Sequence, residues 1–214
     1  MYQPIKIGKI STSKTEIIDI AKAWITLSLA FAIIYAGAHL IGGSFDRIFS
    51  PSFLMFFIVA LFTSGLGFLL HELSHKFVAQ HYGCAAEFRA WDQFLYLALG
   101  LAALVGFIFA APGAVMIHGM VTRKENGHIS VAGPAMNFIL GLIFLALMYF
   151  APVSFSFGGR VFTEMWAIGF RVNMWLGLFN LIPFGPLDGF KIFHWNKAVW
   201  GCLLAFGIIF TFLI

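Results

Sequence analysis

Long apolar blocks separated by short polar stretches run along this chain and predict membrane helices. The block 53–70 (FLMFFIVALFTSGLGFLL) contains no charged residue, and about 20 apolar residues suffice to cross the hydrocarbon core of a bilayer. By the same criterion we expect apolar helices or runs over residues 19–41, 51–81, 94–111, 130–150, 162–182 and 198–214. Apolar and polar residues alternate over 4–10 (PIKIGKI), and glycines interrupt the stretch 112–129 (PGAVMIHGMVTRKENGHI). Both patterns predict extended structure.

Composition agrees with this pattern. Hydrophobic residues make up 61% of the chain and charged residues 10%, with a mean hydropathy of +0.93, whereas soluble domains carry about 25% charge. We therefore expect an all-α polytopic membrane protein with about five or six transmembrane helices and a small membrane-associated β element. The blocks divide the chain into an N-terminal arm with the first helix (1–52), a core (53–195) and a C-terminal helix (196–214). No basic cluster with interleaved aromatics is present, so nucleic acid is not an expected partner.

Ionisable residues appear abruptly where the second apolar block ends. His71, Glu72 and His75 form the sequence HELSH, an HExxH motif. Positions i and i+4 share one helix face, so the two imidazoles can bind one Zn²⁺ and the glutamate can act as general base. The alternative is an ordinary Glu72–Lys76 pair with two histidines at the membrane interface. Because ionisable groups are costly beside a membrane span and are there by default functional, the motif favours a metal site.

A catalytic zinc usually needs a third protein ligand, and Asp188 is the main candidate. It lies in NLIPFGPLDGFKIF (180–193), where two prolines and two glycines interrupt an apolar helix. A broken helix can aim a carboxylate into the protein, although PLDG is also ordinary turn chemistry. A second alternative is a different membrane metallopeptidase in which Glu164, on a later helix, supplies the third ligand.

Three motifs together resemble those of the site-2 proteases, a family of intramembrane zinc metalloproteases. They are HELSH at 71–75, the N-x-x-P-x-x-x-L-D-G element at 180–189, and a Gly-Pro-x-x-Asn sequence at 133–137. The resemblance covers about residues 53–195. The chain departs from the family between 85 and 129: the family commonly has a short membrane-associated hairpin there, whereas this interval contains a full apolar run.

The resemblance implies a function and a role for each motif residue. We expect an intramembrane zinc metalloprotease that hydrolyses peptide bonds within or near transmembrane helices of membrane-protein substrates, with Zn²⁺ as cofactor. The implied zinc ligands are His71, His75 and Asp188. The implied catalytic residues are Glu72 as acid/base and Asn180 at the oxyanion or substrate, and Asn137 is a weaker candidate for substrate binding. The alternative function is a membrane metal-ion transporter or sensor that uses the same His/Asp site.

The apolar strand that follows the third run suggests how a substrate binds. A peptide bond inside a membrane helix is shielded until the helix unwinds, and an unwound segment can add to a strand edge. We therefore expect Val115 and Ile117, within Gly113–Val121, to contact substrate. Neither the substrate's identity nor the oligomeric state follows from the residues.

Charge and zinc geometry together predict the orientation. Asp188 must reach the same depth as His75, because zinc ligands lie about 2 Å from the ion; residues 82–129 must therefore cross the membrane an even number of times or re-enter it. With the N-terminus inside, this arrangement leaves only Arg47 and Arg160 among the loop cations outside, as the positive-inside rule requires. We expect an integral, multi-pass protein of a prokaryotic cell membrane, with its N-terminus and active site toward the cytoplasm.

Overall fold

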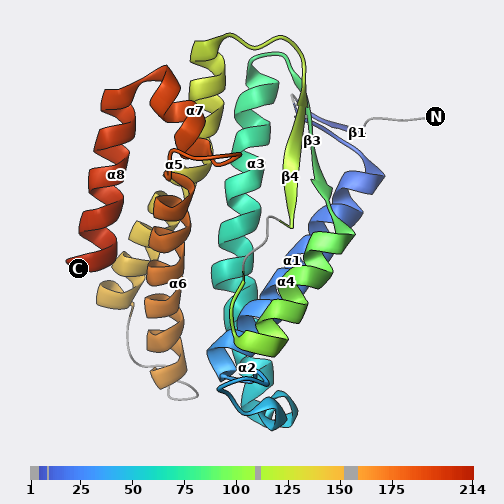
Figure 1. Cartoon of the computed structure of the whole chain (residues 1–214), viewed down its shortest axis with the longest axis vertical. Helices are drawn as coiled ribbons and strands as arrows, with labels where there is room; N and C mark the ends of the chain where they lie inside the picture. Colours follow the sequence, from blue (N-terminus) through green and yellow to red (C-terminus); the bar gives the residue numbers. More distant parts are fainter. Residues whose placement is uncertain (1–4, 9, 109–111, 152–158) are drawn as a thin grey trace. The chain divides into compact units, whose positions relative to one another are not determined.

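The computed structural model describes residues 5–8, 10–108, 112–151 and 159–214, and they are mostly helical (Figure 1). The helices are α1 (Lys14–Ala36), α2 (Pro51–Ala60), α3 (Leu66–His81), α4 (Asp92–Val105), α5 (Arg123–Phe150), α6 (Gly159–Asn180), α7 (Asp188–Trp195) and α8 (Lys197–Phe212). A 3₁₀ helix η1 (Phe45–Phe49) precedes α2, and a π-helical segment η2 (Leu61–Gly65) joins α2 to α3. The strands are β1 (Ile5–Ile7), β2 (Ile10–Thr12), β3 (Ala85–Ala90) and β4 (Gly113–His118).

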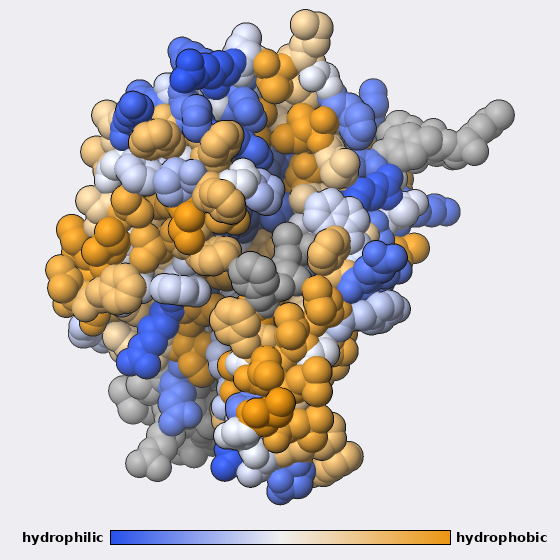
Figure 2. Space-filling view, viewed as in Figure 1, coloured by the Kyte–Doolittle hydropathy of each residue, from blue (hydrophilic) through white to orange (hydrophobic). Residues whose placement is uncertain are grey.

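Three helices are long and apolar enough to cross a membrane. They are α1 with 23 residues, the continuous helix Pro51–His81 with 31, and α5 with 28; α4 and α8 are shorter apolar helices. Apolar side chains gather on the surface over α2 and α4, and also over α8 (Figure 2). The predicted helical fold with a small β element is thus confirmed, and three of its helices could span a membrane; the multi-pass arrangement with five or six spans stays a prediction.

The helix α5 begins earlier than its apolar pattern indicates. Thr122 and Glu125 form a capping box: the Thr122 hydroxyl accepts from the Glu125 amide (3.2 Å), and the Glu125 carboxylate accepts from the Thr122 amide (2.7 Å). This reciprocal pair satisfies amides that a helix start leaves without partners. The helix therefore starts at Arg123, and the prediction of extended structure over 123–129 is wrong.

The chain forms two compact units, and it passes from one to the other within the helix Pro51–His81. The first unit contains Met1–Leu69 and Ala86–Ile117; the second contains Leu70–Ala85 and His118–Ile214. The predicted division at 1–52, 53–195 and 196–214 stays a prediction. In the first unit α1 packs against α2 and α4.

Two small sheets accompany the helices. Strands β1 and β2 pair antiparallel, with Lys6 opposite Ser11, and β3 pairs with β4. Gly113, at the start of β4, lies against Arg89 near the end of β3, and Gly119, just after β4, lies against Cys84, just before β3. The second pair is therefore antiparallel as well.

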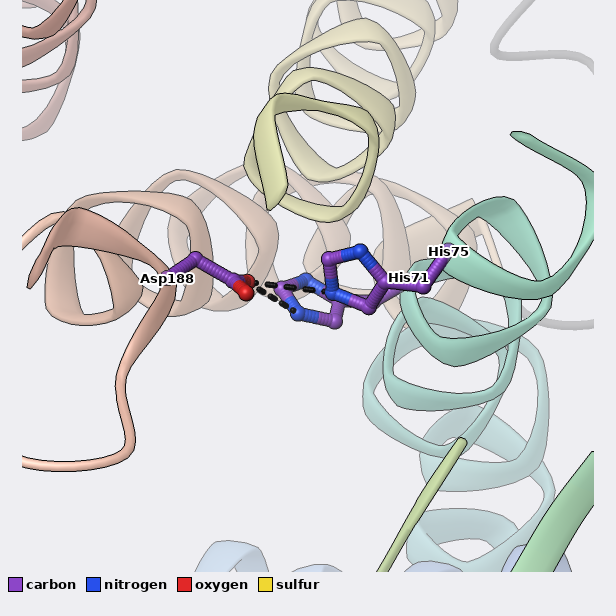
Figure 3. Close-up of side chains that lie close together, drawn as sticks. All are labelled: His71, His75 and Asp188. Atoms are coloured by element: carbon purple, nitrogen blue, oxygen red, sulfur yellow. Dashed lines mark ion pairs between the residues drawn. The ribbon is translucent and has the colours of Figure 1, made fainter. Parts of the chain in front are cut away.

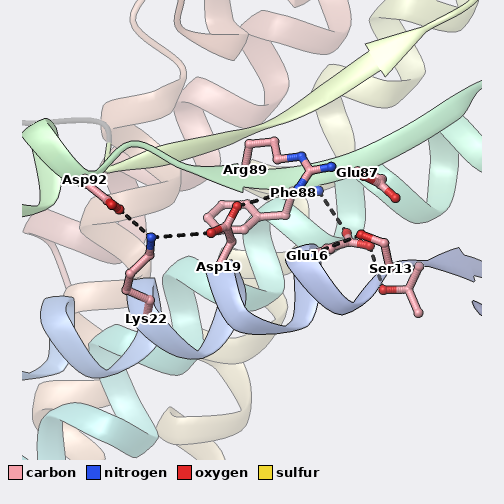
Figure 4. A network of polar contacts seen from close by, with 9 residues as sticks. Ser13, Glu16, Asp19, Lys22, Glu87, Phe88, Arg89 and Asp92 are labelled. Atoms are coloured by element: carbon pink, nitrogen blue, oxygen red, sulfur yellow. Dashed lines mark hydrogen bonds and ion pairs between the residues drawn. The ribbon is translucent and has the colours of Figure 1, made fainter. Parts of the chain in front are cut away.

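A buried carboxylate joins α1 to β3 in the first unit (Figure 4). Glu16 is fully buried; one carboxylate oxygen accepts from the Thr12 hydroxyl (2.7 Å) and the other from the Phe88 amide (2.8 Å). The Ser13 side chain caps the same end of α1 by accepting from the Glu16 amide (3.1 Å). Because each oxygen of this buried carboxylate has a donor, Glu16 ties the start of the helix to the strand.

A helical core organises the second unit. Helices α5, α6, α7 and α8 pack together, with α5 against α6 and α7 and with α8 against α6 and α7. The buried side chains of this core are Phe138, Leu140, Phe144, Phe170, Met174, Leu181 and Ile192. The portion of α3 from Leu70 onward, which carries HELSH, belongs to this unit.

Candidate metal centre

Two histidines on α3 and one aspartate at the start of α7 converge in the second unit (Figure 3). His71 Nε2 lies 3.2 Å and His75 Nε2 lies 3.0 Å from Asp188 Oδ2. All three side chains are buried. The i and i+4 spacing therefore does what the sequence predicts: it turns both imidazoles toward one point, and a distant segment supplies a carboxylate there.

The chain places Asp188 by a tight turn after α6. A Cβ on Gly189 would lie 2.1 Å from the Leu181 carbonyl oxygen, so the residue after Asp188 must be glycine for the backbones to pack this closely. Lys191 Nζ lies 3.9 Å from Asp188 Oδ1, the carboxylate oxygen that does not face the histidines.

The helix α5 shapes the site through three residues spaced four apart. His75 Nδ1 donates to the Ile129 carbonyl oxygen (2.7 Å), and His71 Nδ1 donates to Asn137 Oδ1 (2.6 Å). Between these two contacts, a Cβ on Gly133 would lie 2.5 Å from His75 Nε2 and 2.6 Å from His71 Nε2. With both Nδ1 atoms acting as donors, each Nε2 keeps its lone pair, and the glycine leaves room beside both.

These residues fit a zinc ion. The two imidazole nitrogens and the carboxylate oxygen all lie within 4.8 Å of one another. Ligand atoms of a tetrahedral zinc site, at about 2.0–2.1 Å from the ion, are about 3.3 Å apart, close to the 3.0 and 3.2 Å that separate Asp188 Oδ2 from the imidazoles. The group contains no Glu164, whose side chain is exposed, so the structure favours Asp188 as the third ligand.

Known proteins resemble the chain over most of its length. It is 38% identical over 191 residues to a protein of Methanocaldococcus jannaschii named "Putative zinc metalloprotease", covering 88% of each chain. This chain belongs to the site-2 protease family. "Putative zinc metalloprotease Rip2" of Mycolicibacterium smegmatis is 30% identical over 86% of this chain and 78% of its own.

Further matches cover less of the chain. A second M. jannaschii protein, named "Zinc metalloprotease", is 29% identical over 58% of this chain, and the match spans 30% of that relative. No protein-family profile and no solved structure matches the chain. The predicted membership of the site-2 protease family is confirmed by the relatives alone.

The remaining predicted residues lie in both units. Glu72 is half-buried on α3, between the two histidines in sequence. Asn180 ends α6, half-buried, and its side-chain nitrogen donates to the Leu176 carbonyl (3.0 Å). Val115 and Ile117 lie in β4 of the first unit, where Val115 packs beside the buried Phe88 cluster. Their roles in this member of the family stay predictions.

Asn137 contacts one of the candidate zinc ligands directly. It is fully buried, its oxygen accepts from His71, and its nitrogen donates to Asn173 (3.1 Å). These contacts join Asn137 to His71, and its predicted role in substrate binding stays a prediction. The sequence marks it only through the Gly-Pro-x-x-Asn motif, and the backbone carbonyl of Ile129 carries no sequence signal at all.

Proposed function

We propose that this protein is an intramembrane zinc metalloprotease that cleaves membrane-protein substrates within or near their transmembrane helices, as in regulated intramembrane proteolysis. The observation that carries the proposal is the buried donor set of His71, His75 and Asp188, in a family whose named relatives are zinc metalloproteases. The substrate is a protein, and the lipid bilayer is the second partner.

The proposed chemistry divides between the metal and the chain. His71, His75 and Asp188 would hold zinc, which supplies a Lewis acid and lowers the pKa of a coordinated water. Glu72 would accept the proton of the attacking water and pass it to the departing amine, which is general acid–base catalysis. The Asn180 amide would donate to the negative charge that develops on the scissile carbonyl oxygen.

We propose that an unwound substrate segment pairs with the edge of β4, contacting Val115 and Ile117. Strand addition would use backbone hydrogen bonds and so tolerate varied side chains. Ile117→Pro should abolish cleavage and retain zinc, because proline removes a backbone donor; Ile117→Val should behave like the wild type. Normal cleavage by the proline variant would end this part of the proposal.

The central test replaces the proposed acid/base. Glu72→Gln in the full-length protein, reconstituted in liposomes with a single-span reporter substrate, should retain stoichiometric zinc and lose at least about 10²-fold in cleavage rate, since general acid–base catalysis contributes about 10²–10⁴. Glu164→Gln, an exposed acid in the same unit, is the matched control and should change neither. Unchanged cleavage by Glu72→Gln, together with zinc flux across the liposome membrane, would instead support the metal-transporter alternative.

We also propose that the N-terminus and the active site face the cytoplasm, on the basis of the lysine and arginine distribution. In a background with Cys84 and Cys202 replaced by alanine, the Arg47→Cys variant should react with a membrane-impermeant maleimide applied to intact cells. The Lys197→Cys variant should react only after the cells are permeabilised. The reverse pattern would refute the orientation and leave the proposed chemistry standing.

A further inference from the structure

A chain of hydrogen bonds connects His71 to a helix that carries no metal ligand. His71 Nδ1 on α3 donates to Asn137 Oδ1 on α5 (2.6 Å), and Asn137 Nδ2 donates to Asn173 Oδ1 on α6 (3.1 Å). Asn173 Nδ2 in turn donates to the carbonyl oxygen of Gly169, one turn back on α6 (2.9 Å). Both asparagines are fully buried, so water does not compete for these contacts.

The last acceptor in this series of hydrogen bonds, the Gly169 carbonyl oxygen, determines which group donates at each step. A backbone carbonyl can only accept, so Asn173 must turn its amino group toward Gly169 and its oxygen toward Asn137. Asn137 must then turn its own amino group toward Asn173 and its oxygen toward His71. An oxygen at this position requires a proton on His71 Nδ1, which leaves the lone pair on Nε2, the atom that faces Asp188.

Close packing between α5 and α6 keeps the two amides in register. A Cβ on Gly169 would lie 2.6 Å from the Phe144 ring on α5, so the two helices approach each other closely at the turn that supplies the terminal carbonyl. Met174, the neighbour of Asn173, is fully buried in the same core. An amide in such surroundings has few alternative rotamers.

The second histidine offers an internal comparison. His75 Nδ1 donates directly to the Ile129 backbone carbonyl (2.7 Å), so its tautomer depends on no other side chain. His71 instead depends on two side chains in series. We propose that Asn173 is a positioning residue that sets the tautomer and orientation of His71 through Asn137; this inference rests on the zinc site of the proposed function.

The decisive experiment measures zinc affinity, by chelator competition on the detergent-solubilised full-length protein, together with the visible spectrum of the Co²⁺-substituted protein. Asn173→Leu removes the acceptor that faces Asn137 and should weaken zinc binding about 10–100-fold, as is typical when a metal ligand loses its orienting partner. Asn173→Asp keeps an acceptor oxygen in that position and should bind zinc within about 5-fold of the wild type. Met174→Leu, a volume-conserving neighbour, is the control and should bind like the wild type.

A purely structural role of Asn173 predicts the opposite order of zinc affinities for the two variants. A buried carboxylate in an apolar core is costly whereas leucine is not, so if Asn173 only fills space, Asn173→Asp should be the poorer zinc binder. That order, or wild-type affinity in Asn173→Leu, would overturn the proposal. If Asn173→Leu does not fold, a more than 100-fold loss in Asn173→Asp would overturn it as well.

The same measurements separate this inference from the proposed function. Zinc binding that responds to Asn173 in a protein that cleaves no substrate would support the positioning role and refute the protease. Zinc binding and cleavage that ignore Asn173 would refute the positioning role and leave the protease intact. A wild-type protein without zinc affinity would refute both.

Discussion

Two buried carboxylates, one in each unit, show how partners distinguish a structural acid from a metal-binding one. Glu16 in the first unit accepts from a hydroxyl and from a backbone amide, both of which bring hydrogens. Asp188 in the second unit faces the Nε2 atoms of His71 and His75, whose protons are held at Nδ1 by other acceptors. Three lone pairs that point at one another repel unless a cation lies between them.

Burial alone does not identify a metal site. Glu16 is more deeply buried than Asp188, at 0% against 7% exposed, yet its oxygens are satisfied by the protein itself. Asp188 Oδ2 lies where the protein supplies two imidazole acceptors in place of donors, which is the arrangement expected of a metal centre. Removing each carboxylate should therefore have opposite consequences for metal content and for folding.

The largest effect is expected for Asp188→Ala. Loss of one of three ligands should weaken zinc binding by more than about 100-fold, the upper limit for outer-shell changes, and should reduce cleavage to background. Metal analysis after gel filtration would measure this, with Glu164→Ala as the control that keeps its zinc. Full zinc occupancy in Asp188→Ala would remove the contrast between the two carboxylates.

The next effect concerns the space that α5 leaves for the metal. Gly133→Ala would put a methyl group 2.5 Å from His75 Nε2 and should weaken zinc binding about 10–100-fold by displacing the imidazoles. Gly141→Ala, on the same helix, meets the flexible end of Met174 (2.6 Å) and should affect stability only. Equal zinc affinities of the two variants in a chelator titration would contradict this role of Gly133.

A smaller effect, on stability alone, is expected in the first unit. Glu16→Ala leaves the Phe88 amide and the Thr12 hydroxyl without their acceptor and should cost about 1–3 kcal/mol of unfolding free energy per unsatisfied group. Zinc stoichiometry of the folded protein should not change. Glu16→Gln, which retains one acceptor oxygen, should be the milder variant in a denaturation series in detergent; loss of zinc in either variant would show that the first unit does influence the metal.

The smallest effect is expected at an exposed ion pair of the first unit. Lys22 pairs with Asp92 and lies 3.5 Å from Asp19, and surface ion pairs contribute less than about 1 kcal/mol. Lys22→Met should therefore shift the denaturation midpoint only slightly, and the shift should shrink further in high salt. If Lys22→Met lowered the unfolding free energy as much as Glu16→Ala does, the Lys22–Asp92 pair would be a major contributor to stability.

The metal centre was more predictable than the fold around it. HELSH places two imidazoles on one helix face from spacing alone, and the helix-breaking NLIPFGPLDG stretch identifies Asp188 as a candidate carboxylate. Glu16 could not be found in the same way, because KTEIID is an ordinary amphipathic helix start and the donor at Phe88 lies far away in sequence. Likewise the early start of α5 follows from one capping box, which an apolar pattern does not record.

The sequence by itself determined that the chain is helical with apolar segments long enough to span a membrane, and which side chains are candidate metal ligands, since both depend on composition and on local spacing. Only the tertiary structure decided what surrounds those side chains: the Ile129 carbonyl and the Asn137–Asn173 pair that hold the imidazoles, and the glycine that leaves room beside them. The physical reason is that hydrogen-bond partners and free volume come from helices distant in sequence. No local pattern specifies where two such helices touch.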